Sequence, residues 1–324
     1  MSHLQNSEST DTALYLAQYN REVGMSLGDG SWQELVYSSY VIAIYSIVGG
    51  KSVRVAMSHC RQFCSFLVQL SRKQKRIDDW VELLWRDLLA SLYYVHRDVV
   101  VFKKSLDCIA HWKELLETSY TLLVSEDDIV NLPLSMTTEK ICHKINSLSV
   151  YMHIYLDQFL IRVNAAENAE ETKVTKIRLD SILDRIVRLV ARLPHISDYI
   201  HHAYHLGSNL RSVNSSTANA FLMFPHVRPR ALKSGSEPTS RDTALAILYA
   251  FSRLLRTMLE SNAYDDKFER DTRTSAIAIC RLCANLPLEN PIETLLVERS
   301  LFWSGIILTE SRFPSGQNQF SFIL

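Results

Sequence analysis

Glycine and proline are scarce in this chain, whose 324 residues include only nine glycines and eight prolines. Tight β-turns depend on these two residue types, so their scarcity argues against a protein built from many short strands. Long apolar runs are missing as well. The longest candidate, Val41 to Val48, is interrupted by Ser46 and followed by two glycines, whereas a membrane-spanning helix needs about 18 or more consecutive apolar residues. We therefore expect no membrane-spanning segment.

The chain also lacks net charge, because 35 lysines and arginines are matched by 35 aspartates and glutamates. Nucleic-acid-binding domains usually carry a basic excess, since neutralising phosphates supplies much of their affinity. The polar residues 1–12 do not have the form of a secretory signal. We expect an intracellular protein that does not bind nucleic acid by itself.

What the chain does contain is hydrophobic residues at helical spacing along most of its length. The sequence Ser31-Trp-Gln-Glu34 has the form of a capping box and predicts a helix start, and Asn290-Pro291 predicts another. About ten such segments without a fixed repeat predict an all-α fold, a single irregular multi-helix domain. We place this domain at residues 13–310, between a disordered N-terminus at 1–12 and a C-terminal tail at 311–324.

Two polar stretches interrupt the helical pattern. Residues 214–241 contain three prolines and no apolar periodicity, so we expect a flexible loop there. Residues 165–173 are polar and acidic, and we expect an exposed joint there, followed by a helix over 175–193 that Pro194 ends and another helix from Ser197.

Two tryptophan-centred segments stand out near opposite ends of the chain. Residues 84–90 read Leu-Trp-Arg-Asp-Leu-Leu-Ala, and residues 301–305 read Leu-Phe-Trp-Ser-Gly. Together they resemble two segments of the fungal-specific transcription factor domain, the C-terminal regulatory domain of fungal zinc-cluster transcription factors. These are a Leu-Trp-x-Asp-Leu-x-x-Ala helix, from which this chain departs by having Ala90 one position early, and a Leu-Phe-Trp-x-Gly-like segment. The resemblance extends over residues 13–308.

This resemblance implies a nuclear, all-helical regulatory module without enzymatic activity, in control of metabolic or secondary-metabolite genes. Such a module passes a signal to a partner transcription regulator or to the transcription machinery, and a homodimer is one form that it can take. The signal can be an apolar small molecule that shifts a two-state equilibrium. The basic run at residues 72–76 is either a nuclear localisation signal or a solvated turn.

The cysteines do not form the zinc cluster of that family. A binuclear cluster needs its six thiolates in one short basic segment, because each must reach one of two adjacent zinc ions. Here Cys280 and Cys283 form a lone Cys-x-x-Cys pair, and His201 and His205 share a helical spacing without a third ligand. We expect buried free thiols, a partly exposed histidine face and no metal or other cofactor. The cysteines are Cys60, Cys64, Cys108, Cys142, Cys280 and Cys283.

The aromatic residues in and around the two tryptophan segments fit two interpretations. They can form the hydrophobic core, or they can line an apolar pocket for a small effector, as helices of bundles do. In either case we expect Trp85 and Trp303 to be buried, because large aliphatic residues flank each of them. The candidate pocket residues are Trp80, Trp85, Tyr93, Phe302 and Trp303.

Residues 265–269, Asp-Asp-Lys-Phe-Glu, offer an alternative from a different class. They resemble the Asp-rich motif of terpene cyclases, all-helical enzymes of secondary metabolism whose carboxylates hold magnesium and diphosphate. No second carboxylate motif follows, and acidic residues at a helix N-terminus explain the same sequence. A third interpretation is an adaptor that binds no ligand.

The charge balance predicts weak and non-specific DNA binding by this chain alone. Without an excess of positive charge, few counterions are released on binding, and without a cysteine cluster no recognition helix is ordered in the major groove. Electrophoretic mobility shifts at physiological salt should show no complex below micromolar protein. A sequence-specific complex at nanomolar protein that survives competitor DNA would contradict this prediction.

Overall fold

The computed structural model describes helices along most of the chain. The described residues are 32–48, 53–74, 81, 84–93, 114–115, 138–164, 169–208, 239–260, 266–284 and 291–309. All of them are helical except Arg192, Leu193, Thr239 and Ala284, and no strand occurs among them. The prediction of an all-α fold is therefore confirmed for these residues. None of the described helices is long and apolar enough to cross a membrane.

The chain divides into two compact units, residues 1–136 and 137–324. The expectation that residues 13–310 form a single domain stays a prediction, because two compact units can still unfold in one cooperative transition. Three predicted segments fall outside the described residues, apart from the last positions of the loop. They are the N-terminus at 1–12, the loop at 214–241 and the tail at 311–324.

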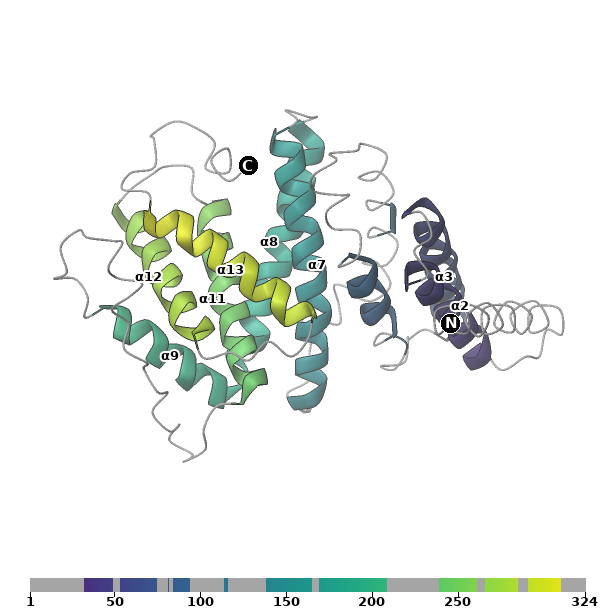
Figure 1. The fold of residues 1–324 in the computed structure, drawn as a ribbon, viewed down its shortest axis with the longest axis horizontal. Coiled ribbons are helices and arrows are strands. Elements are labelled where there is room, and N and C mark those ends of the chain that lie inside the picture. Colours follow the sequence, from purple (N-terminus) through teal and green to yellow (C-terminus); the bar gives the residue numbers. More distant parts are fainter. Residues whose placement is uncertain are drawn as a thin grey trace, which may run out of the picture. The chain divides into compact units, whose positions relative to one another are not determined.

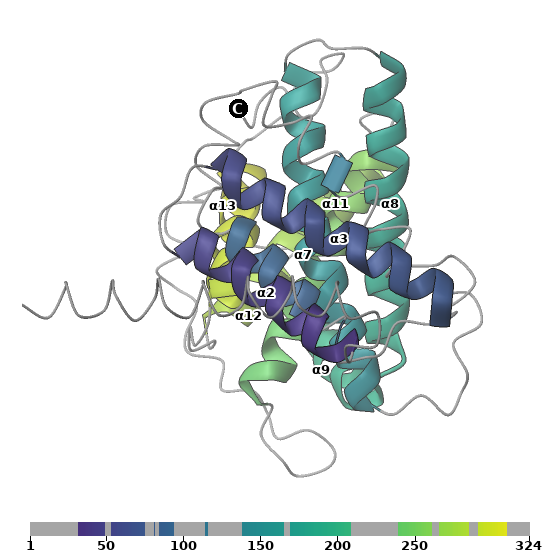
Figure 2. The same cartoon turned by 90° about the vertical axis from the view of Figure 1, so that its right-hand side faces the viewer.

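In the first unit, α2 (Trp32–Val48) and α3 (Val53–Gln74) pack against each other, as Figures 1 and 2 show. α2 begins directly after Ser31, where the capping box predicts a start. α3 buries one apolar stripe, and the helical segment 84–93 buries a second set of large side chains. The buried side chains of α3 are Ala56, Met57, Cys60, Phe63, Cys64 and Leu67, and those of residues 84–93 are Trp85, Leu88, Leu89, Leu92 and Tyr93.

The second unit contains six described helices that pack on one another. These helices are α7 (Thr138–Asn164), α8 (Ala169–Ala191), α9 (Pro194–Ser208), α11 (Ser240–Glu260), α12 (Asp266–Cys283) and α13 (Pro291–Thr309). α7 pairs with α8, α8 with α11, α11 with α12, and α12 with α13, while α9 packs on α12 and α11. Figure 1 shows α13, in yellow, lying across α11 and α12.

Two helix starts differ from the sequence-based prediction. α8 begins at Ala169, so much of the acidic stretch predicted as a joint is helical. Glu170 and Glu171 lie in its first turn, where negative charge stabilises the positive end of the helix dipole. Pro194 is the first residue of α9, where its fixed φ and missing N–H are tolerated, so this helix starts before the predicted Ser197.

The start of α11 is fixed by a reciprocal capping box. The Asp242 N–H donates to Thr239 Oγ1 at 3.1 Å, and the Thr239 N–H donates to Asp242 Oδ2 at 3.0 Å. Two N–H groups that a helix start leaves without a partner are thereby satisfied. His195 Nε2 of α9 lies 3.2 Å from Asp242 Oδ1, so this cap also connects α9 with α11.

Burial differs between α7 and α13. Every residue of α7 from Ser147 to Arg162 is buried. α13 carries apolar residues around its whole circumference, the pattern of a helix that is packed on all sides. Nevertheless Trp303 is 3% exposed whereas its neighbour Phe302 is 56% exposed, so only part of α13 is covered.

The predicted burial of both tryptophans is confirmed, since Trp85 is 0% and Trp303 is 3% exposed. Truncating either to Ala should lower the free energy of unfolding by about 3–5 kcal/mol, because a large cavity remains in the core. Urea unfolding followed by circular dichroism measures this loss. Ile177→Ala, at a position that is 58% exposed, is the control and should cost about 0.5 kcal/mol or less. A tryptophan variant no less stable than this control would contradict the prediction.

Candidate functional site

Trp85 lies in an aromatic cluster of the first unit. Its ring stacks on Phe63 of α3, with ring centroids 5.8 Å apart and planes inclined by 21°, and Tyr40 of α2 lies 6.5 Å from Phe63. Burial, and to a smaller extent the negative charge of Asp87, raises the pKa of Tyr40. The three rings therefore pack on one another, as core residues do.

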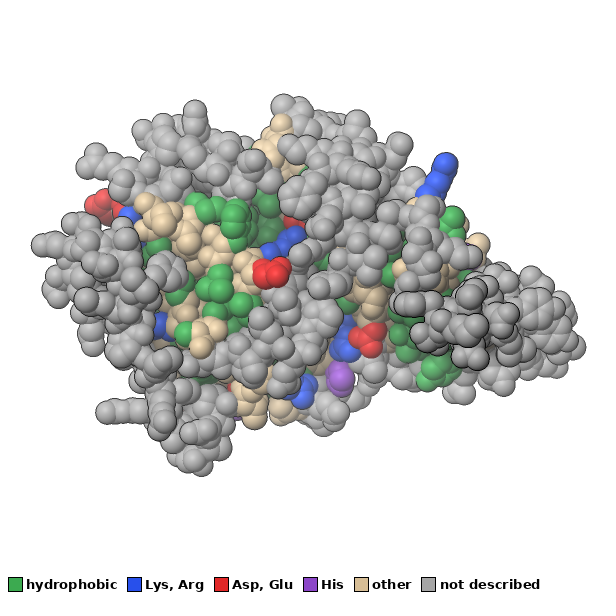
Figure 3. All heavy atoms as spheres, in the orientation of Figure 1, with side chains coloured by type: hydrophobic (Ala, Val, Ile, Leu, Met, Phe, Trp, Pro, Cys, Tyr) green, Lys and Arg blue, Asp and Glu red, His purple; other side chains and the backbone are tan. Residues whose placement is uncertain are grey.

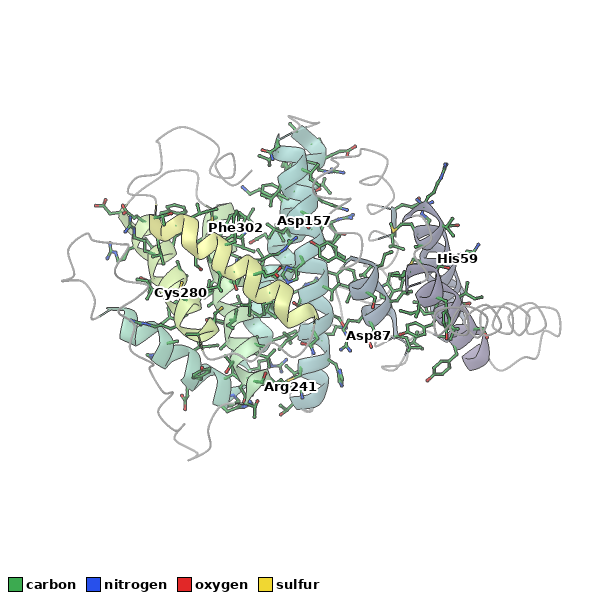
Figure 4. The ribbon with its side chains drawn as sticks, viewed as in Figure 1. His59, Asp87, Asp157, Arg241, Cys280 and Phe302 are labelled. Atoms are coloured by element: carbon green, nitrogen blue, oxygen red, sulfur yellow. The ribbon has the colours of Figure 1, made fainter. Side chains whose placement is uncertain are left out.

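The polar residues of the first tryptophan segment lie outside this packing. Arg86 and Asp87 form an ion pair of 2.7 Å, and the Asp87 side chain is 44% exposed. Ser91 Oγ donates to the Asp87 carbonyl at 2.7 Å. The segment thus buries Trp85 and leaves Asp87, labelled in Figure 4, partly in contact with solvent.

The second tryptophan segment directs its two aromatic rings differently. Trp303 is buried together with Ser300 and Ser304, whose side chains are fully covered. Their hydroxyls donate to carbonyls one turn earlier in α13, at 2.6 Å to Leu296 and 2.7 Å to Ser300. The exposed Phe302 ring leaves the helix on another side and does not share this environment.

The five candidate pocket residues are therefore not equivalent. Trp85 and Tyr93 are buried in the first unit, and Trp303 is buried in the second unit. Phe302 belongs to the second unit and is exposed, while Trp80 lies outside the described residues. An apolar pocket formed by these residues stays a prediction.

A group of polar side chains links α7 and α13, and the sequence analysis did not single it out. We call His153, Asp157 and Arg299 the α7–α13 polar cluster. Arg299 Nη2 donates to Asp157 Oδ2 at 2.6 Å, and Arg299 Nη1 donates to the backbone carbonyl of His153 at 3.3 Å. The Asp157 and Arg299 side chains are only 6% and 15% exposed. This ion pair links α13 to α7, and removing either partner would leave a buried charge without its counterpart. Figure 4 labels Asp157 on α7.

His153 is the member of this cluster whose side chain makes no hydrogen bond. It is 1% exposed, and neither ring nitrogen has a hydrogen-bond partner. Burial, and then the positive charge of Arg299, lowers the pKa of His153 well below 6.5. The imidazole is therefore neutral at physiological pH. A buried polar nitrogen without a partner costs about 1–3 kcal/mol, so His153 destabilises the packing that Arg299 and Asp157 maintain.

A sequence signal for this cluster exists but is indirect. His153, Asp157 and Arg162 recur about one turn apart in a stretch of α7 that is otherwise largely apolar. Isolated polar residues in such a helix indicate burial with partners on neighbouring helices. The signal does not name those partners, because Arg299 lies far away in the sequence.

The cysteines behave as structural residues. Cys60, Cys64 and Cys142 are buried thiols outside any disulfide bond, as predicted, while Cys108 lies outside the described residues. Burial of the half-buried pair on α12 raises the pKa of Cys280 to about 11 and that of Cys283 to about 12. Thiols with such pKa values are protonated at neutral pH and react slowly.

The predicted metal-binding alternatives gain no support from the residues that the structure describes. Among these residues no three His, Cys, Asp or Glu side chains gather closely enough to hold a metal ion. Asp266 and Glu269 lie in the first turn of α12, and Glu269 pairs with Arg273 at 3.0 Å. They therefore act on the dipole and surface of their own helix. Asp265 and the side chain of His205 lie outside the described residues, and His201 is exposed.

Comparison of the chain with protein-family models, curated proteins and solved structures finds no match in any of the three.

His153 predicts a specific pH dependence of stability. In the unfolded chain its imidazole titrates near pH 6.5, whereas the folded chain binds that proton only at lower pH. Between these two pKa values the unfolded state binds more protons, so the free energy of unfolding should fall as the pH falls, by up to about 1.4 kcal/mol per pH unit. Substituting His153→Leu should remove this contribution and raise stability at neutral pH by about 1 kcal/mol or more.

Urea unfolding of the parent chain and of the His153→Leu variant between weakly acidic and neutral pH measures how steeply the free energy of unfolding of each depends on pH. Substituting the exposed His201→Leu is the control and should leave the slope of the parent chain in place. Equal slopes for the parent chain and the His153→Leu variant would mean that His153 is not buried as a neutral group.

Proposed function

We propose that this protein is a transcriptional regulator, in which an all-helical module acts through a partner regulator or the transcription machinery and responds to an apolar small molecule. The observation that carries the proposal is the pair of tryptophan segments at residues 84–90 and 301–305, with their resemblance to the fungal-specific transcription factor domain. It is supported by the packing of both segments, since each is helical and each has its tryptophan in the core of its unit.

The distribution of charge supports indirect contact with DNA. The net charge is zero, and Arg256 of α11 is engaged by three carboxylates. It lies 3.1 Å from Asp180 and 2.8 Å from Asp184, both on α8, and 2.8 Å from Glu260. An arginine held in this way is not available to neutralise phosphates, which is the main source of affinity in DNA binding. In this proposal the partner regulator supplies the contact with DNA.

The α7–α13 polar cluster supports a response to a signal. Arg299 and Asp157 hold α13 on α7, while His153 makes the same arrangement less stable. Opposing contributions of this kind leave a smaller free-energy difference between two packings, and a ligand needs only a modest difference in affinity to shift such an equilibrium. We propose that the effector acts on the packing of α13.

The experiment that tests this function combines gene deletion with chromatin immunoprecipitation in the host cell. We expect deletion to change a defined set of transcripts, and we expect the tagged chain to be found at those genes only while its co-purifying regulator is present. Trp303→Ala, which disrupts the module, should reproduce the deletion, whereas Ile177→Ala should behave as the parent chain. Unchanged transcripts together with no co-purifying regulator would refute the proposal.

A thermal shift assay separates a sensor from an adaptor without a ligand. A compound that binds only the folded state raises the apparent stability by RT ln(1 + [L]/Kd), so an apolar effector should raise the Tm in a concentration-dependent way. A Tm that no apolar metabolite of the host raises would favour the adaptor. Turnover of prenyl diphosphates with magnesium would favour the cyclase alternative.

A further inference from the structure

One side of α13 presents an exposed aromatic ring. The helix has apolar residues around its circumference, which is typical of a helix with packing partners on all sides. Its Trp303 side is covered by the second unit, but Phe302 is 56% exposed. Glu298 and Thr309, which share the Phe302 side at helical spacing, are exposed too. Figure 3 shows hydrophobic side chains, in green, reaching the surface among the helices of this unit.

Gly305 gives the exposed side its shape. It lies one turn after Phe302 and is therefore its neighbour on the helix surface. A Cβ atom added to Gly305 would have no heavy atom within 4 Å, so open space lies beside the exposed ring. No charged residue occurs between Ser300 and Thr309. A large ring and an open position are thus neighbours on this side, and Glu298, one turn before Phe302, is the charged residue that shares it.

We infer that this surface is the interface of a homodimer, in which α13 packs antiparallel across the α13 of a second copy and each Phe302 covers the Gly305 of the other. The contact is isologous, because every copy supplies one ring and one open position around a twofold axis. The inference concerns assembly and holds whether or not the chain regulates transcription.

The residues around Phe302 favour a second copy of this chain as the occupant. A surface that contains both the ring and the space to receive it is complementary to itself, so the contact needs no other sequence. In the antiparallel register that joins Phe302 to Gly305, Glu298 lies opposite Thr309 of the partner subunit, and the two carboxylates do not meet. Exposed aromatic residues and a lack of charge are also typical of the centre of protein interfaces.

Sedimentation velocity over a range of concentrations tests the inference on the full chain. We expect the parent chain to form a dimer, and we expect Phe302→Gly to weaken association by at least about tenfold, since it removes the central ring. Gly305→Phe should weaken it similarly, because rings would then meet rings. This second variant should still fold, since a Cβ atom at this position meets no heavy atom within 4 Å and phenylalanine is a better helix former than glycine.

The double substitution Phe302→Gly with Gly305→Phe is the decisive variant. It exchanges ring and open position within each copy, so an antiparallel pair again matches ring to space and association should return towards that of the parent chain. If association were non-specific and hydrophobic, Gly305→Phe alone would have the opposite effect, because an additional exposed ring would strengthen association.

The matched control is Ile177→Ser, which changes an equally exposed hydrophobic residue on α8. It should leave association unchanged, and circular dichroism should show every variant to be as helical as the parent chain. The inference fails if the parent chain stays monomeric at all concentrations, if Ile177→Ser weakens association as much as Phe302→Gly, or if Gly305→Phe strengthens it. If the double variant does not fold, the test uses Gly305→Leu instead. This variant fills the space that receives the partner's ring, so it must weaken association.

Discussion

A buried polar side chain requires a partner in its own helix or on a neighbouring one, and for two buried charges of α7 this requirement is met by other helices of the second unit. Asp157 meets it through Arg299 of α13, and Arg162 meets it through Glu171 of α8 at 3.0 Å. Each of these pairs fixes one neighbour against α7. The ring of His153 does not meet this requirement, so α7 contains both an ion pair to a neighbouring helix and a source of instability.

Further polar contacts join the other helices of this unit. Arg256 joins α11 to α8, and Arg281 of α12 donates to the Ala203 carbonyl of α9 at 3.2 Å. Tyr204 of α9 donates to Ser275 of α12 at 3.3 Å. Partly exposed pairs of this kind contribute little to the free energy of unfolding. Since their geometry is satisfied only when the correct helices meet, they favour one arrangement of apolar helices over others of similar burial.

α13 combines three roles on three sides. Trp303 belongs to the core, Arg299 connects the helix to α7, and Phe302 faces outward. Arg299 lies less than one turn from Phe302 and about one turn from Trp303. The proposed effector response and the inferred dimer interface thus act on the same element, which gives assembly a direct physical route to affect the response.

Much of this architecture is local and could be predicted from the sequence by itself. The all-helical class follows from hydrophobic spacing, the starts of α2 and α13 follow from capping residues, and the burial of Trp85 and Trp303 follows from the aliphatic residues around them. These features depend on residues within a turn or two of one another.

The candidate site could not be predicted in the same way. α13 has no apolar stripe, so its sequence cannot distinguish the buried Trp303 from the exposed Phe302 beside it. The partner of Asp157 lies 142 residues away, and no local pattern selects Arg299 among the arginines of the chain. The sequence by itself determined which segments are helices, because hydrogen bonds and caps within a helix are local. Only the tertiary structure decided which side of each helix is covered, because burial depends on which distant segments pack there.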